Sequence, residues 1–205
     1  MSLKNCLALL FVLAFLSFLI QSDFGNVNVK SHTLYSSNNQ FVVYDLYKPS
    51  SASKENKAPF IVVVPGFQRS KEALSNIAIE LSRRGNVVAL IDPYAQGMSS
   101  SSLSRRAATT EGYGMFALID TVSKGNLFDF VDTDKMASTG HSMGGNAAIR
   151  GANYFGREAI RENKKSKLHS VYVSGYVLTL TEKVLEDVRS NVGVSYALYD
   201  EGAFR

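Results

Sequence analysis

The chain has 205 residues, enough for one domain of ordinary size with a buried core. Hydrophobic residues make up 45% and charged residues 20%, a balance that excludes a disordered chain. The net charge of +4 comes from scattered Lys and Arg without an aromatic-plus-basic motif, so nucleic acid is not an expected partner, and the single cysteine excludes an internal disulfide and a cysteine-based zinc site.

An uncharged apolar run, Leu7–Ile20, lies near the N-terminus. As a helix this run spans about 21 Å, less than a hydrocarbon core of about 30 Å, which favours the apolar region of a signal peptide. Extension of the run to Leu3 and Phe24 gives a longer, tilted helix, and no Ala-x-Ala cleavage pattern is present, which favours a membrane anchor.

Both interpretations stay open for residues 1–24. Lys4 precedes the run, so its positive end is expected to stay inside the cell in either case. The chain from about residue 25 onward is therefore expected outside, either secreted or held at the membrane through residues 3–24.

Strand and helix patterns alternate along the rest of the chain. Two runs separated by a polar turn predict a hairpin, 26–36 with 40–49. Continuous apolar runs predict strands buried on both faces, and helical spacing predicts helices between them. The expected strands are 60–64, 86–92, 135–140, 168–177 and 192–199, and the expected helices are 70–84 (capped by Ser70), 115–122, 144–156 and 181–188. This order implies right-handed crossovers, and hence an α/β fold with a mostly parallel central sheet and helices on both faces.

The sequence Gly140-His141-Ser142-Met143-Gly144 lies between a predicted strand and a predicted helix. A strand that turns into a helix within about one residue strains the serine backbone, and a Cβ two residues before or after the serine would clash. The strain presents the hydroxyl, and the N–H of Met143 points toward a developing oxyanion. The pattern predicts that Ser142 is a nucleophile, with a glycine-rich turn and an incidental serine as the alternative.

Several segments resemble the α/β-hydrolase superfamily, and the likeness extends from about Asn26 to the last residue. "VVVPGF" is similar to its third strand and oxyanion loop, "VVALIDPYAQGMSS" to its fourth strand and following loop, and "DTDKMASTGHSMGG" to its fifth strand and nucleophile elbow. Some polyester- and lipid-cleaving members have Pro-Gly-aromatic in the oxyanion loop, as here. The resemblance implies a serine esterase or lipase that needs no metal and no cofactor. It also implies that the N–H of Phe67 is the second oxyanion donor and that its ring forms a wall of the acyl pocket.

A serine nucleophile needs an imidazole base and a carboxylate that orients the imidazole. In the superfamily the acid follows the serine and the histidine comes last; by this resemblance the acid is Asp200. None of the three histidines follows Asp200. His141 adjoins the serine in a tight turn and is expected to pack the elbow. His32 lies in the first hairpin, and His169 lies near the start of a strand, away from the active edge of the sheet.

The base is therefore expected outside this sequence, and residues 25–205 are expected to form an α/β-hydrolase domain that is incomplete at its C-terminus. The leading hypothesis is a serine hydrolase that cleaves small or lipid-like carboxylic esters through an acyl-enzyme, with the chain as given inactive or nearly so. The alternative is a non-catalytic binding protein on the same fold. A haloacid- or epoxide-type hydrolase needs an aspartate at the elbow, and Ser142 argues against it.

Overall fold

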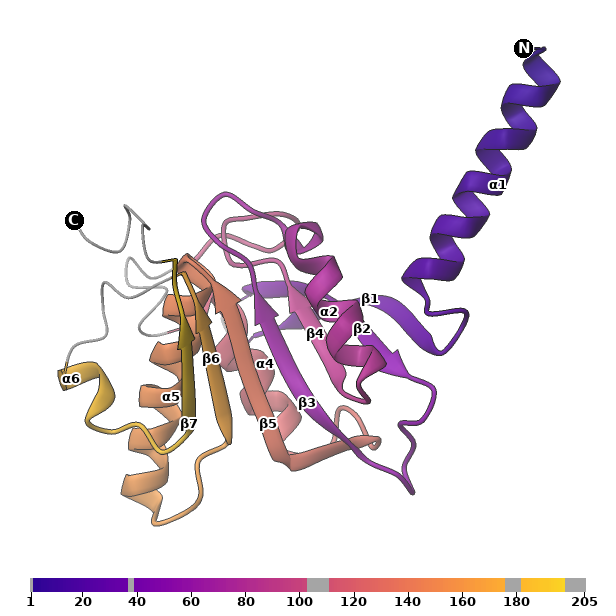
Figure 1. Cartoon of the computed structure of the whole chain (residues 1–205). Coiled ribbons are helices and arrows are strands. Elements are labelled where there is room, and N and C mark those ends of the chain that lie inside the picture. The colour runs from indigo at the N-terminus through magenta and orange to yellow at the C-terminus, as the bar shows by residue number, and fades with distance from the viewer. Residues whose placement is uncertain (1, 37–38, 103–110, 176–181, 198–205) are drawn as a thin grey trace.

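A computed structural model describes residues 2–36, 39–102, 111–175 and 182–197. They form a seven-stranded sheet in the order β1-β2-β4-β3-β5-β6-β7 (Figure 1). β2 pairs antiparallel with β1 and β4, and all other neighbours are parallel. The strands are β1 (Val27–Tyr35), β2 (Phe41–Pro49), β3 (Ala58–Val64), β4 (Val87–Ile91), β5 (Val131–His141), β6 (Ser170–Ser174) and β7 (Asn191–Ser195). The predicted α/β fold with a mostly parallel sheet is confirmed.

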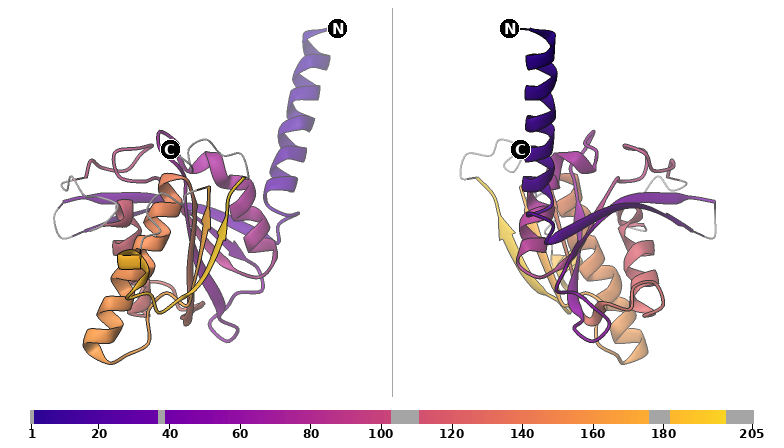
Figure 2. Two further views of the ribbon diagram at one scale, coloured as in Figure 1. Left: turned by 60° about the vertical axis from the view of Figure 1, so that its left-hand side comes forward. Right: turned by 90° about the vertical axis from the view of Figure 1, so that its right-hand side faces the viewer.

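Helices cover both faces of this sheet (Figure 2). On one face, the 3-10 turn η1 (Lys71–Leu74) leads into α2 (Ser75–Arg83), which packs on β2 and β4. On the other face lie η2 (Gly112–Gly114), α4 (Met115–Ser123) and α5 (Met143–Glu162), and the short helix α6 (Glu182–Leu185) contacts α5. The two-sided cover explains why β4 is buried along its whole length.

The helix expected over residues 70–84 begins differently from the prediction. Ser70 precedes η1 but makes no side-chain capping hydrogen bond, and its hydroxyl donates to the carboxylate of Glu72 instead. Lys71 also binds this carboxylate, at 2.8 Å, and reaches Asp45 on β2 at 3.2 Å. The hydrogen bonds from Lys71 and Ser70 lower the pKa of Glu72 to about 2. The side chains at this turn therefore fasten it to the sheet, and Ser70 does not cap the helix.

The N-terminal helix α1 (Leu3–Gln21) projects away from the domain (Figure 1). It has 19 residues, none of them buried, so it spans about 28 Å, close to the thickness of a hydrocarbon core. Among the described residues it is the one helix with the length and apolarity to cross a membrane, a test that a signal sequence also passes. The observed helix is longer than the Leu7–Ile20 run because it continues by a turn at its start.

The α2 face carries an open apolar hollow beside the helix. This hollow has a volume of about 650 Å³ and lies over β3, β5, β6 and β7, with Ile77, Tyr172 and Val192 in its lining. All three of these side chains are at least 40% exposed. The described residues thus leave the α2 face of the sheet partly uncovered next to the end of β5.

Helix α5 begins so close to β3 that two positions must be glycine. A Cβ on Gly144 would lie 1.9 Å from the carbonyl oxygen of Val64, and a Cβ on Gly140 would lie 2.7 Å from the same oxygen. Contacts this short are not tolerated, because packed interiors have no spare space. The glycines fix how closely the end of β5 and the start of α5 approach β3.

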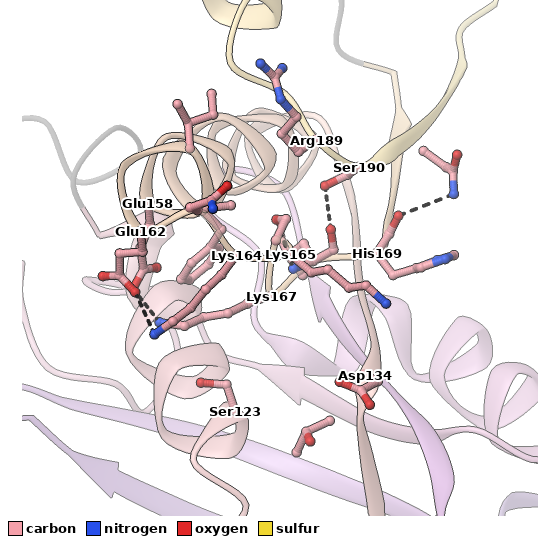
Figure 3. Close-up of a pocket in the computed structure, with 18 of the residues that line it drawn as sticks. Ser123, Asp134, Glu158, Glu162, Lys164, Lys165, Lys167, His169, Arg189 and Ser190 are labelled. Atoms are coloured by element: carbon pink, nitrogen blue, oxygen red, sulfur yellow. Dashed lines mark hydrogen bonds and ion pairs between the residues drawn. The ribbon is translucent and has the colours of Figure 1, made fainter.

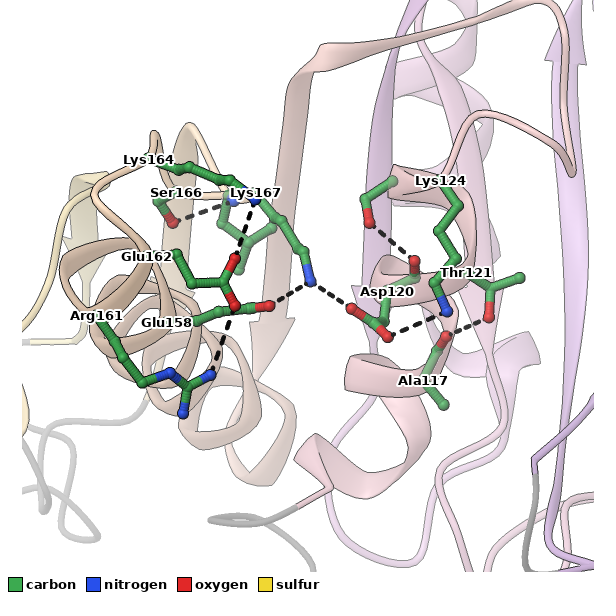
Figure 4. Close-up of polar contacts among 12 residues, drawn as sticks. Ala117, Asp120, Thr121, Lys124, Glu158, Arg161, Glu162, Lys164, Ser166 and Lys167 are labelled. Atoms are coloured by element: carbon green, nitrogen blue, oxygen red, sulfur yellow. Dashed lines mark hydrogen bonds and ion pairs between the residues drawn. The ribbon is translucent and has the colours of Figure 1, made fainter.

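Lys167 joins α4 to α5 at the opposite edge of the sheet (Figure 4). Its ammonium group binds Asp120 on α4 and Glu158 on α5, the latter at 2.8 Å. Burial would lower the pKa of Lys167, but the hydrogen bonds to the two carboxylates outweigh it, and the pKa lies above the ordinary value. The lysine thus separates two carboxylates that would otherwise repel each other.

The close approach of α5 to β3 predicts that Gly144→Ala is severely destabilising. The added methyl group meets backbone, so relief requires moving a strand or a helix, and we expect a loss of about 3 kcal/mol or more in the free energy of unfolding. The comparison is Gly125→Ala: a Cβ at Gly125 meets nothing within 4 Å, so its cost is limited to the strain of a φ of 74°, about 1–2 kcal/mol. Urea denaturation measures both; equal losses would contradict the packing assigned to Gly144.

The Lys167 bridge predicts that Lys167→Met lowers the free energy of unfolding by about 1 kcal/mol, because the two carboxylates lose their common partner. Lys164→Met is the matched control: Lys164 binds the exposed Glu162 at 3.3 Å, and its loss should change stability by less than about 0.5 kcal/mol. Thermal denaturation of both variants checks the difference. Indistinguishable melting temperatures would show that the bridge adds nothing.

Candidate active site

Ser142 occupies a strained turn between β5 and α5. Its φ is 55° and its ψ is −118°, a backbone conformation that residues with a side chain rarely adopt. Two hydrogen bonds hold the turn: the N–H of Ser142 donates to the carbonyl of Ser174 at 2.9 Å, and its carbonyl accepts from the N–H of Asn146 at 3.0 Å. The predicted strand–serine–helix turn is confirmed as geometry, and it places Ser142 at the carboxyl edge of the sheet.

The loop after β3 lies directly against this serine. A Cβ placed on Gly66 would come within 3.3 Å of the Cβ of Ser142, so the backbone that leads to Phe67 passes beside the side chain. The first N–H groups of α5, starting with Met143, have no partner within the helix. The structure therefore brings the loop of Phe67 and the start of α5 at Met143, the two predicted oxyanion residues, together beside Ser142. The ring of Phe67 is 67% exposed, so it stands open to the surroundings.

Gln96 holds the predicted oxyanion loop, residues 65–70, in shape. Its side-chain carbonyl accepts a hydrogen bond from the N–H of Gln68, and its side-chain amide donates to the carbonyls of Gly66 and Arg69, both at 3.3 Å. These contacts flank Phe67 on both sides. Gln68 has a φ of 54°, which turns the chain sharply after Phe67. Sequence reasoning missed Gln96, because no local pattern shows that its loop folds over the loop after β3.

The carboxylate of Asp92 holds the same two loops together. Its carboxylate is buried and accepts hydrogen bonds from the backbone N–H of Lys71 at 2.7 Å and of Met98 at 2.9 Å. A Cβ on Gly97 would lie 2.3 Å from this carboxylate, which explains the glycine in the loop. The signal available in the sequence was an aspartate at the carboxyl end of a buried strand. Asp92 thus positions the loops through these backbone contacts.

The serines after Gly97 replace strand pairing at the end of β4. The hydroxyl of Ser99 accepts from the N–H of Val43 at 2.8 Å, and that of Ser100 accepts from the N–H of Phe41 at 2.9 Å. Each satisfies a backbone donor of β2 beyond the point where β4 ends. Ser99 and Ser100 therefore continue the hydrogen bonding of β2 beyond the end of β4.

The three histidines lie in different places. His32 stacks on Tyr44 in the first hairpin, with ring centroids 5.4 Å apart. His169 directly precedes β6, where Ser170 pairs with Ala137, so six residue steps along the strand, about 20 Å, separate it from the level of Ser142. The imidazole of His141 lies against Gly66 and Gly175, at 3.4 Å and 3.1 Å from the positions of their absent Cβ atoms. Asp200, the predicted acid, lies outside the described residues.

Solved structures with a similar fold include hydrolases and esterases. The α/β hydrolase GrgF from Penicillium is 17% identical, with a TM-score of 0.58 over 72% of this chain and 46% of that one. The esterase from Pyrobaculum calidifontis is 21% identical, with a TM-score of 0.57 over 81% and 50%. Brefeldin A esterase, a bacterial homologue of human hormone-sensitive lipase, is 15% identical, with a TM-score of 0.56 over 78% and 44%. At these identities the likeness shows the α/β-hydrolase fold, and the chain spans about half the length of these proteins.

The sequence itself matches one family over most of its length. Residues 17–181 match the PETase family, described as PET hydrolase-like, whereas no curated protein matches the chain. The matched range includes the oxyanion loop, the loop held by Asp92 and Gln96, and the elbow at Ser142. The chain therefore belongs to the PET hydrolase-like family of the α/β-hydrolase superfamily.

Proposed function

We propose that this protein is a serine hydrolase that cleaves carboxylic esters through an acyl-enzyme. The observation that carries the proposal is the strained turn at Ser142, with the loop of Phe67 against it. Strain of this kind persists only where surrounding structure enforces it, and it is concentrated at functional sites. Membership in the PET hydrolase-like family and the fold shared with esterases support the same reaction class.

In the proposed reaction, the hydroxyl oxygen of Ser142 attacks the ester carbonyl carbon while a histidine takes its proton. The negative charge that develops on the carbonyl oxygen accepts hydrogen bonds from the N–H groups of Met143 and Phe67. The histidine then gives the proton to the departing alcohol. Water, activated by the same histidine, releases the acid and restores the serine. Asp200 is proposed to orient the histidine, and no metal or organic cofactor takes part in this scheme.

We further propose that the catalytic histidine lies outside these 205 residues. His32 and His169 are far from the elbow, and His141 is turned between Gly66 and Gly175. A chain without this base keeps only the oxyanion hole and substrate binding, which give weak catalysis. The chain as given is therefore proposed to be nearly inactive by itself. The second candidate function, a binding protein without catalysis, is favoured by the same arrangement of histidines.

The N-terminal helix supports an extracytoplasmic location. We propose that residues 1–24 form a membrane anchor, with a cleaved signal peptide as the alternative, and that residues 25–205 form the hydrolase domain outside. Its substrate is then an ester available at the outer surface, either a small soluble molecule or a lipid-like one.

The nucleophile is tested with a fluorophosphonate probe on the full-length product of the gene. We expect covalent labelling at Ser142, identified by mass spectrometry, and none in the Ser142→Ala variant. The 205-residue chain, which lacks the proposed base, should react slower by several orders of magnitude. No labelling of Ser142 in a folded full-length sample would refute the hydrolase and favour the binding protein.

The support of the oxyanion loop is tested by Asp92→Asn. Both carboxylate oxygens accept backbone N–H groups, so an amide leaves one N–H facing another donor, and we expect a loss of about 1–3 kcal/mol in the free energy of unfolding. Fluorophosphonate labelling of the full-length protein should slow as well, since the loops around Phe67 loosen. Asp134→Asn, at an exposed site on the opposite edge, is the control. Unchanged labelling in Asp92→Asn would show that Asp92 does not position the loop.

A further inference from the structure

The junction between α1 and the domain is fastened by Arg83, at the end of α2. Its guanidinium group binds the carboxylate of Asp23 at 3.1 Å and donates to the carbonyl of Ile20 at 2.8 Å. This carbonyl belongs to the last turn of α1, where backbone acceptors lack helical partners and a positive charge is favourable. The chain then turns through Asp23, Phe24 and Gly25, all with positive φ, and the N–H of Val27 donates back to the carbonyl of Ser22 at 2.9 Å. The helix is thus tied to the domain in a defined direction.

That direction points past the active-site edge of the domain. In Figures 1 and 2, α1 runs from its attachment toward the same side on which the parallel strands β3, β5 and β6 end. Ser142 and the loop of Phe67 follow two of these strand ends. If α1 crosses a bilayer with its N-terminus inside, the outer surface of that bilayer lies on the active-site side. Membrane-spanning helices are commonly tilted by about 20° from the bilayer normal, so α1 does not have to be perpendicular to the membrane.

The described loops at this edge have the chemistry of a lipid-facing surface. Phe67 is 67% exposed and Met98 is 71% exposed, and Gln96 holds their two loops together. Residues 93–102 contain no charged side chain, and Arg69 is the single charge in residues 65–70. Exposed aromatic and apolar tips beside a lone arginine suit the level of lipid headgroups.

The opposite edge of the sheet carries a cavity whose lining is rich in charged side chains (Figure 3). This cavity has a volume of about 1160 Å³, and its lining includes Lys164, Lys165, Lys167, Glu158 and Glu162. Such a surface is stable in water and costly to bring into a bilayer. The apolar end of the sheet, which suits contact with lipid, is therefore the same end toward which α1 points.

We propose that α1 stays attached as an anchor and that the Arg83 junction holds the active-site edge against the outer leaflet of the same phospholipid bilayer, with Phe67 and Met98 at headgroup depth. The inference rests on the anchor of the proposed function. It also narrows the substrate to esters that partition into the bilayer, because the edge of the sheet that carries Ser142 then faces lipid.

The chain has no tryptophan, so one substitution provides a unique fluorescent reporter. The Met98→Trp variant of the full chain is reconstituted in phosphatidylcholine nanodiscs with and without brominated acyl chains. We expect a blue-shifted emission that brominated lipid quenches. The Lys165→Trp variant reports the opposite edge, and its emission should be unchanged. Phe67→Trp is a second reporter of the active-site edge, should Met98→Trp fail to fold.

The junction is tested by adding Arg83→Ala to Met98→Trp. Quenching should fall several-fold toward the Lys165→Trp value while the protein still floats with lipid. Arg84→Ala is the matched control, because Arg84 binds Glu80 and not α1, and it should leave quenching unchanged.

Equal quenching at both edges, or none at either, overturns the proposal. So does a mature protein that has lost residues 1–24 and does not float with lipid. Fluorophosphonate labelling of Ser142 is independent of these readings, so a failed orientation and a failed hydrolase are distinguishable.

Discussion

The approach of α5 to β3 is the constraint on which the rest of the site depends. With glycine at 140 and 144, the strand end and the helix start come within contact of the Val64 carbonyl, and the chain between them has room for one strained residue. That residue is Ser142. The same closeness brings the loop after β3 against the serine, so this packing contact places the proposed nucleophile beside the proposed oxyanion donors, and Gln96 and Asp92 then hold the loop.

Most of the fold was predictable because the sheet is buried on both sides at its centre. Continuous apolar runs marked β3 and β4, and the glycine pattern marked the elbow, since each depends on residues adjacent in sequence. Element ends were less predictable: β5 begins before its apolar part, and α5 continues past the predicted end at Gly156 to Glu162. Ser70 looked like a helix cap, but its hydroxyl donates to Glu72, two residues along the chain, and accepts no capping N–H.

The parts of the site that escaped sequence reasoning are the long-range supports. Gln96 and Asp92 act on residues 21 to 30 positions away, through contacts that exist only once β3 and β4 lie side by side. The proposed catalytic base and acid are a different case from these long-range supports. Asp200 stays a prediction and the place of the catalytic base stays a proposal: His32 and His169 lie far from Ser142, and His141 packs between Gly66 and Gly175.

The central claim is that Ser142, Met143 and Phe67 form one catalytic unit. A crystal structure of the full-length protein inhibited by a phosphonate tests it most directly. The account predicts a bond from the Ser142 oxygen to phosphorus, with the phosphoryl oxygen about 2.7–3.1 Å from the backbone nitrogens of both Phe67 and Met143. A phosphoryl oxygen directed away from these two amides, or a phosphonate on another residue, would contradict it.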